Sequence, residues 1–190
     1  MISTQIIIMA KVPVAGISKI RLIPELGIKK TEQLAKMLFQ HTIDEAIAEN
    51  IGPVKLCVTP CIDHESWQQF NIPEHVLWQQ HDGDLGERLT TISYQVTQQQ
   101  LPYLIIGTDC PTLDRNVLLS AAQALQYSDT CIIPVSDGGY ALLGLHQHHD
   151  SNFDRIPWST TQVCALTEQR ITALKWSISK LQKLHKDILC

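Results

Sequence analysis

The sequence predicts an α/β fold built around a mainly parallel β-sheet. Short apolar runs, such as the three consecutive isoleucines near the N-terminus, alternate with longer segments of helical periodicity. Strands that alternate with helices form βαβ units, in which the strands run parallel. The predicted strands are Gln5–Ala10, Val54–Thr59, His75–Gln79, Tyr103–Gly107, Thr130–Val135 and Tyr140–Leu145, with a late strand near Ala173–Ile178.

Helical segments fill the intervals between these strands. Thr31–Asn50 carries apolar residues at helical spacing. Asp84 and Glu87 form a capping-box pattern that opens a helix reaching about Gln100. Further predictions are that Asp114 caps a helix over Arg115–Gln126, and that Ser159 or Thr160 caps a helix reaching about Arg170.

Length and composition favour one soluble domain over residues 1–190. A net charge of -4 gives no bulk attraction to nucleic acid or to an anionic membrane. No apolar run reaches the roughly 20 residues that span a bilayer, and no signal-peptide pattern is present, so the cytoplasm is the expected compartment. The six cysteines are too scattered for a zinc site and are expected to be reduced, with Cys57 and Cys131 as small core residues.

Ligands of open α/β sheets bind beyond the carboxyl ends of the strands, so the loops that follow the predicted strands are where chemistry is expected. The first, "KVPVAGISKIRL", carries Lys11, Lys19 and Arg21 around Gly16. It matches neither GxGxxG nor GxxxxGK[ST]. Glycine lets the backbone approach a ligand, and the cations suit phosphate, but a solvated basic loop is the alternative.

Carboxylates follow two later strands. Asp109 comes at the end of a buried strand, where an ionised carboxylate needs a partner, and a hard cation such as Mg²⁺ is the partner we expect. Asp137 precedes Gly138 and Gly139, a pattern typical of a tight hairpin that also lets a sugar or base approach the backbone. Asp84 is either a helix cap alone or part of a nucleotide-contacting loop, in which Arg88 supports the site or pairs with a carboxylate.

The segment "HQHHDSNFDRIPWST" holds three histidines and Asp150 but lacks metal-ligand spacing, so a solvated loop is favoured. Phe153 and Trp158 either shape an acceptor pocket or anchor the core. The sequence shows no Ser-His-Asp pattern, GxSxG elbow or HExxH, so hydrolysis by those routes is not expected.

Five segments, "KVPVAGISKIRL", "GDLGERL", "GTDCPTL", "DGGYALLGL" and "FDRIPWST", together resemble a known family across residues 5–175. The first resembles its KxPxPGxxKTRL signature. The family comprises bacterial glycosyltransferase-like proteins labelled radical-SAM/selenodomain-associated transferases or arsenosugar-biosynthesis glycosyltransferases. It belongs to the nucleotide-diphospho-sugar transferase superfamily of GT-A type, which includes the 2-phospholactate and molybdenum-cofactor guanylyltransferases.

The resemblance implies a three-layer α/β/α sandwich with a mixed, mostly parallel sheet. It also implies a metal-dependent transferase that takes a nucleotide-activated donor and a small-molecule acceptor. Glycosyl transfer is favoured on family grounds alone. Guanylyltransferase-like nucleotidyl transfer, with release of pyrophosphate, and a non-catalytic nucleotide-binding protein are the alternatives. A homodimer is compatible with the sequence, which does not require one.

Carried over residue by residue, the resemblance assigns roles to the loops. Lys11, Gly16, Lys19 and Arg21 would bind the phosphates of the nucleotide, and Asp137 would lie in the donor or acceptor site. With the loop residues Asp84, Gly138 and Gly139, these four form the predicted nucleotide-binding set. Asp109 would coordinate Mg²⁺ or Mn²⁺, and Asp109, Asp137 and Lys19 form the predicted catalytic set. Ala15 and Ile20 replace a proline and a threonine of the signature, and the C-terminal "SKLQKLHKDILC" lacks the acidic ending of the family.

Overall fold

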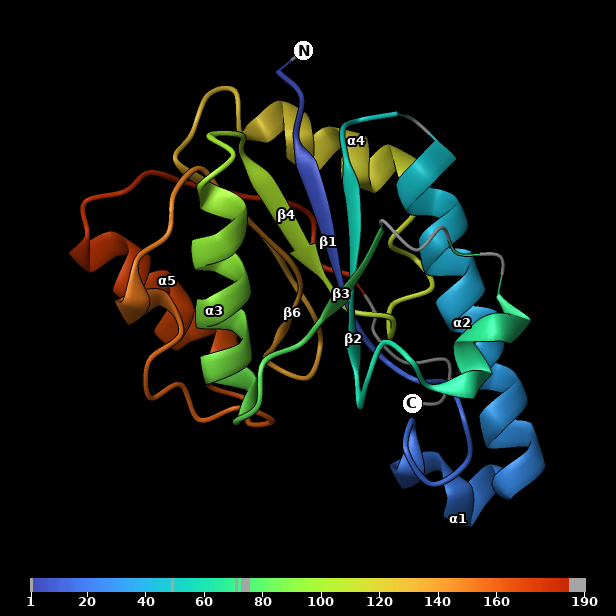
Figure 1. The fold of residues 1–190 in the computed structure, drawn as a ribbon. Coiled ribbons are helices and arrows are strands. Elements are labelled where there is room, and N and C mark those ends of the chain that lie inside the picture. Colours follow the sequence, from blue (N-terminus) through green and yellow to red (C-terminus); the bar gives the residue numbers. More distant parts are fainter. Residues whose placement is uncertain (1, 49, 71, 73–75, 185–190) are drawn as a thin grey trace.

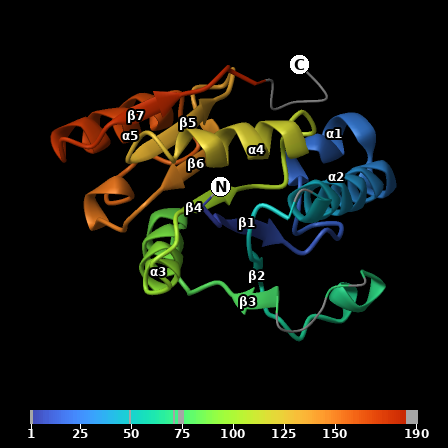
Figure 2. The ribbon, with the colours of Figure 1, turned by 90° about the horizontal axis from the view of Figure 1, so that it is seen from above.

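A computed structural model describes residues 2–48, 50–70, 72 and 76–184. Its centre is a seven-stranded sheet with the order β3-β2-β1-β4-β6-β5-β7 (Figures 1 and 2). The strands are β1 (Gln5–Lys11), β2 (Val54–Thr59), β3 (Leu77–Gln79), β4 (Tyr103–Ile106), β5 (Thr130–Pro134), β6 (Tyr140–Leu145) and β7 (Ile178–Lys180). Only β6 of these strands runs antiparallel to its neighbours, β4 and β5. The predicted mixed, mostly parallel sheet is confirmed.

Helices cover both faces of the sheet. Figure 2 shows α2 (Ile28–Ala48) and α4 (Arg115–Ala124) on one side, and α3 (Leu85–Thr97) and α5 (Val163–Ala173) on the other. A short 3₁₀ turn, η1 (Ile20–Leu22), and the helix α1 (Ile23–Leu26) link β1 to α2. The predicted three-layer α/β/α sandwich is therefore confirmed. None of the described helices is both long and apolar enough to cross a membrane.

The isoleucine run of β1 forms the centre of both cores. Ile6 and Ile8 pack with Phe39 of α2 in one apolar cluster, whereas Ile7 packs with Tyr103 in the cluster on the opposite face. Successive side chains of a strand point to opposite faces, so a strand covered on both sides needs a continuous apolar run. Each fully buried isoleucine contributes roughly 1.5–3 kcal/mol of transfer free energy.

The two cysteines predicted to be core residues are buried, Cys57 in one cluster and Cys131 in the other. Burial raises the pKa of each thiol to about 12, so both stay protonated at neutral pH. They are packing residues, as predicted.

The direction of β6 corrects one expectation. The loop that follows Tyr140–Leu145 was among those where we expected chemistry, but the antiparallel β6 delivers its carboxyl end to the opposite edge. The histidine-rich turn after it therefore lies near the start of β4 and the end of α4, where His146 Nε2 donates to Leu125 O. The chain then returns along α3 and α5, so residues 153–161 reach the ligand-binding edge after all.

Helix starts were predicted well where a side chain makes the cap. Asp84 forms the predicted capping box with Glu87, and Asp114 caps α4 by accepting from Val117 N at 2.9 Å. The predicted cap of α5 by Ser159 or Thr160 is wrong. That helix begins at Val163, and a tertiary contact, Cys164 N to Gly138 O at 2.9 Å, satisfies a donor of its first turn.

The ends of the chain differ from the sequence prediction. The late strand is Ile178–Lys180 and not Ala173–Ile178, because α5 continues to Ala173. His75, part of the predicted third strand, and residues 185–190 of the C-terminal segment lie outside the described residues.

The cap at Asp84 carries a testable stability effect. Asp84→Ala should lower the free energy of unfolding by about 1 kcal/mol, because the N–H of Glu87 loses its acceptor. Asp84→Ser keeps a capping oxygen and should cost only a few tenths of that. Urea denaturation of the two variants measures both effects, and equal losses would contradict the cap assignment.

Candidate functional site

The structure brings Lys19 and Asp109 into direct contact. Lys19 leaves the loop after β1, and Asp109 leaves the loop after the neighbouring parallel strand β4. The ammonium Nζ of Lys19 donates to a carboxylate oxygen of Asp109 and, at 3.2 Å, to the carbonyl of Thr108. Parallel neighbours end at the same edge of a sheet, which is why residues 90 positions apart meet here.

The environment of Asp109 differs from the sequence expectation. We expected a buried carboxylate whose partner is a metal ion, but its side chain is 43% exposed and its partner is Lys19, which is only 10% exposed. Asp109 is therefore not a buried carboxylate that needs a metal ion to balance its charge.

The donor set is nevertheless compatible with magnesium. Among the described residues no three His, Cys, Asp or Glu side chains gather into a metal cage. Magnesium needs no such cage, since one or two carboxylates with substrate phosphates and waters complete its octahedron. A half-exposed carboxylate beside a loop that carries cations fits that pattern.

Helix α2 holds both loops in place through contacts that the sequence did not reveal. Glu32 accepts a hydrogen bond from Ala15 N at 3.3 Å, and His41 Nε2 donates to Pro111 O at 2.9 Å. Glu45 accepts three bonds from Arg115, at 2.8 Å from N, 3.0 Å from Nε and 2.9 Å from Nη2. These polar residues lie on a helix with an amphipathic pattern, so only the tertiary arrangement identifies their role.

The Glu45–Arg115 pair predicts a specific pH dependence. Hydrogen bonds from Arg115 lower the pKa of Glu45 from its ordinary 4.5 to about 2. A depressed folded-state pKa stabilises the protein above about pH 4.5 and loses that effect as pH falls towards 2.

Glu45→Gln should accordingly lower the unfolding free energy near neutrality by on the order of 1 kcal/mol, since Arg115 is 45% exposed and solvent screens the pair. The deficit relative to wild type should shrink as pH falls from 5 towards 2. Urea denaturation across that range measures it, with Glu25→Gln on α1 as the control. A deficit that does not change with pH would contradict the assignment.

The glycine-rich turn between β5 and β6 lies at the same edge as Asp109. Ile106 of β4 is opposite Leu142 of β6, so the residues that follow β4 run towards this turn. Asp137 is exposed and accepts a bond from Gly139 N at 2.9 Å. The predicted hairpin is confirmed, with Gly138 at a φ of 86°.

Residues 153–161 connect this hairpin to the start of α3. A Cβ on Gly86 would lie 2.8 Å from Phe153 O and 2.9 Å from Trp158 Nε1. Phe153 is 1% exposed, so it is a core anchor and not part of a pocket wall. Trp158 is partly buried against the same cluster.

Arg88 holds the loop before α3 together, and within the described part of the chain its bonds go to a carbonyl and an amide oxygen, not to a carboxylate. Arg88 Nε donates to Gly83 O at 2.9 Å, and Nη1 donates to Gln80 Oε1 at 3.3 Å. A pocket of about 160 Å³ adjoins this loop, and its lining includes Gln80, His81, Arg88, Cys57 and Ile92. Asp84 itself is engaged as a helix cap.

The other predicted phosphate-binding residues line the outside of the first loop. Lys11 is exposed at the end of β1, opposite Thr59 of β2, and Arg21 is exposed in η1. Gly16 has a φ of 81° and open space around it. Ile20, which replaces the threonine of the signature, is 55% exposed. Lys19 is a predicted cation that this structure places against Asp109.

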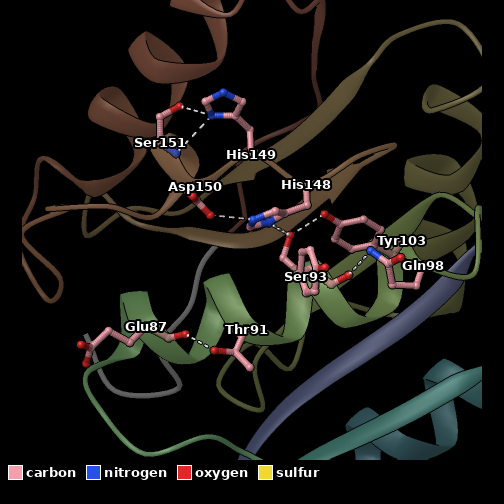
Figure 3. A network of polar contacts seen from close by, with 10 residues as sticks. Glu87, Thr91, Ser93, Gln98, Tyr103, His148, His149, Asp150 and Ser151 are labelled. Carbon is pink, nitrogen blue, oxygen red and sulfur yellow. Dashed lines mark hydrogen bonds and ion pairs between the residues drawn. The ribbon is translucent and has the colours of Figure 1, made fainter.

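A second polar network overturns the expectation that no Ser-His-Asp arrangement exists. His148 Nδ1 lies 3.0 Å from Ser93 Oγ, and His148 Nε2 lies 2.8 Å from Asp150 Oδ1 (Figure 3). Ser93 also bonds to the hydroxyl of Tyr103 at 2.6 Å. His148 is thus packed and bonded, whereas His146, His149 and Asp150 are exposed, as predicted for a solvated loop.

This network is not a hydrolytic site. Ser93 has no exposed surface, so no substrate reaches its hydroxyl. The network lies at the opposite edge of the sheet from Asp109, and it ties α3 to β4 and to the turn after β6. Burial raises the pKa of Tyr103, which keeps its hydroxyl protonated.

The fold is similar to two solved structures of nucleotide-handling proteins. A candidate nucleotide-diphospho-sugar transferase from Desulfovibrio desulfuricans G20 superposes with a TM-score of 0.89 at 24% identity, covering 98% of this chain and 83% of that one. CMP:2-keto-3-deoxy-manno-octonic acid synthetase in complex with CTP gives 0.59 at 12% identity, covering 96% and 90%. At these identities the likeness shows the fold alone.

Sequence comparison adds the family. No curated protein matches the chain. The family model described as "Uncharacterized protein conserved in bacteria (DUF2064)" matches residues 42–160, which is more than half of the chain. The chain therefore belongs to the DUF2064 family.

Proposed function

We propose that this protein is a metal-dependent transferase that uses a nucleotide-activated donor, and that the transferred group is a sugar. The observation that carries the proposal is the contact between Lys19 and Asp109 at the carboxyl edge of β1 and β4. A fixed cation suits a phosphate, and a half-exposed carboxylate suits a divalent cation that binds the same phosphates.

The proposed chemistry asks the site to stabilise a leaving group. Glycosyl transfer from a nucleotide sugar releases a nucleoside diphosphate, and negative charge develops on it as the bond breaks. Lys19, together with Lys11 and Arg21 on the same loop, would bind that diphosphate and neutralise its charge. A cation bound by Asp109 would supply further neutralisation of the same charge.

The remaining predicted residues have supporting roles in this proposal. Gly16, at a φ of 81° with open space around it, lets the loop approach the phosphates closely. Asp137, Gly138 and Gly139, in the turn that follows β5 at the same edge of the sheet, would let a sugar or an acceptor lie against the backbone. The pocket beside Gln80 and Arg88 would take part of the nucleoside.

The similar structures support a nucleotide-using transferase and leave its type open. One of them is a candidate nucleotide-diphospho-sugar transferase, and the other is a synthetase complexed with CTP. The resemblance to radical-SAM-associated and arsenosugar glycosyltransferases is what favours the sugar. Nucleotidyl transfer remains the second candidate, because its pyrophosphate leaving group calls for the same cations.

Calorimetric titration tests the proposal directly. Nucleotide sugars and nucleoside triphosphates would be titrated separately into the protein with and without Mg²⁺. Preferred binding of nucleotide sugars, and release of a nucleoside diphosphate with an acceptor, is the expected result. Release of pyrophosphate from a triphosphate would instead identify a nucleotidyltransferase. Binding without turnover would identify a non-catalytic binder, and no nucleotide binding by folded protein would reject all three.

A further inference from the structure

We propose that Lys19 is the resident counter-ion of Asp109, so that a divalent cation reaches Asp109 only together with the phosphates that draw Lys19 away. The inference rests on the proposed function in assuming that phosphates bind at this edge. It adds an order to that binding: metal and donor enter as a unit, and the metal alone is excluded.

The ammonium of Lys19 is held in one position by its contacts, unlike that of an exposed lysine whose long side chain moves freely. Its side chain is 10% exposed, and Nζ uses two acceptors from one loop, Asp109 and the carbonyl of Thr108. The backbone of Lys19 adopts the left-handed region, with φ 55° and ψ 28°. That region is disfavoured for residues with a Cβ, so the surrounding structure must compensate for it.

This arrangement disfavours a metal ion that arrives alone. A divalent cation at Asp109 would share the carboxylate with an ammonium group already in contact with it, and like charges repel. The protein offers little to offset that repulsion, since the described part of the chain holds no group of three His, Cys, Asp or Glu side chains suited to a metal.

A bound diphosphate makes binding of a divalent cation at Asp109 favourable. Its oxygens offer Lys19 an alternative acceptor, and the flexible stem of lysine lets the ammonium move as a point charge. Asp109, 43% exposed, then becomes available to a cation that also takes phosphate oxygens as ligands. Linkage makes the effect mutual: if the nucleotide tightens metal binding, the metal tightens nucleotide binding by the same factor.

Binding of Mn²⁺, followed by electron paramagnetic resonance and calorimetry, tests the inference without any turnover assay. Wild type, Lys19→Met and Lys30→Met would each be titrated with Mn²⁺ in the absence of nucleotide. Lys30 is an exposed lysine on α2, so its variant controls for the loss of one positive charge. We expect Lys19→Met to bind Mn²⁺ at least tenfold more tightly than wild type, about 1.4 kcal/mol, and Lys30→Met to match wild type.

The second titration adds GDP or UDP, corrected for the metal that each nucleotide binds in solution. In wild type a nucleotide should raise Mn²⁺ affinity at least tenfold, and in Lys19→Met this coupling should be much weaker. If Lys19→Met does not fold, as judged by circular dichroism, Lys19→Gln replaces it with a neutral side chain of similar length.

The outcomes separate this inference from the proposed function. Tight Mn²⁺ binding by nucleotide-free wild type, equal to that of Lys19→Met, would overturn the inference and leave a nucleotide-binding transferase standing. Nucleotide binding with no gain of Mn²⁺ affinity in Lys19→Met would do the same. If neither nucleotide nor Mn²⁺ binds any variant, both the inference and the proposed function are rejected.

Discussion

Asp109→Asn should reduce turnover of the nucleotide donor by about 10²–10³-fold while leaving the fold intact. Asparagine matches the shape of aspartate but carries no charge, so it neither attracts a divalent cation nor orients Lys19 through an ion pair. Loss of one preorganised electrostatic group from a transferase site costs about this factor in kcat. The stability effect should stay within about 1 kcal/mol, because the Asp109 side chain is 43% exposed and solvent screens its ion pair.

The measurement is steady-state release of the nucleoside diphosphate, with the unfolding midpoint recorded for each variant. Asp44→Asn is the matched control, since Asp44 is an exposed carboxylate on α2 that accepts a bond from Gln40, and asparagine can still accept it. Full activity in Asp109→Asn would remove Asp109 from the chemistry. A large loss of stability in the variant would instead show that Asp109 is mainly a structural residue.

The meeting of Lys19 and Asp109 illustrates what sequence reasoning can reach. The rule that parallel strands end at one edge places both loops there, without any knowledge of side-chain contacts. The rule does not say which cation meets which carboxylate, since Lys11, Lys19 and Arg21 share one loop. That choice depends on the path of the loop, including the left-handed backbone at Lys19, which no residue preference at this position signals.

The direction of β6 explains why the sequence did not predict the position of the loop that follows it. The strands β2 and β6 have the predicted bounds, because an apolar run shows where a strand is. The run does not show which way the strand points, so the loop after β6 was included among the chemistry-bearing loops although it lies at the opposite edge. The contact of His148 with Ser93 spans 55 positions and depends on this reversal, so local spacing does not predict it.

The start of α5 shows a second limit of prediction from sequence, which concerns helix caps. Capping residues are recognisable when their own side chains make the bond, as Asp84 and Asp114 do. At α5 the acceptor is a carbonyl of the distant hairpin, Gly138 O, which every residue type carries and no sequence pattern marks. Gly138 therefore contacts both the first turn of α5, through this bond, and the segment 153–161, through Thr161. The positions of the hairpin, of α5 and of that segment depend on these contacts.

Gly138→Ala is accordingly the second large effect that we expect, this time on stability. Gly138 has a φ of 86°, and an added Cβ would lie 2.6 Å from the carbonyl carbon of Thr161. The φ angle alone costs about 1–2 kcal/mol for a residue with a Cβ. Overlap with backbone atoms adds roughly 1–3 kcal/mol, because neither segment can rotate a side chain out of the way.

Gly16→Ala separates the two contributions. Gly16 has a φ of 81°, close to that of Gly138, and a Cβ there would meet nothing within 4 Å, so this variant reports the cost of a positive φ without the overlap. Urea denaturation should therefore show Gly138→Ala to be clearly the less stable of the two. Equal losses of unfolding free energy in the two variants would mean that the backbone at Thr161 moves away from the added Cβ at no cost. In that case the hairpin would not be held against α5, and the position of Asp137 at the edge of the site would not depend on that contact.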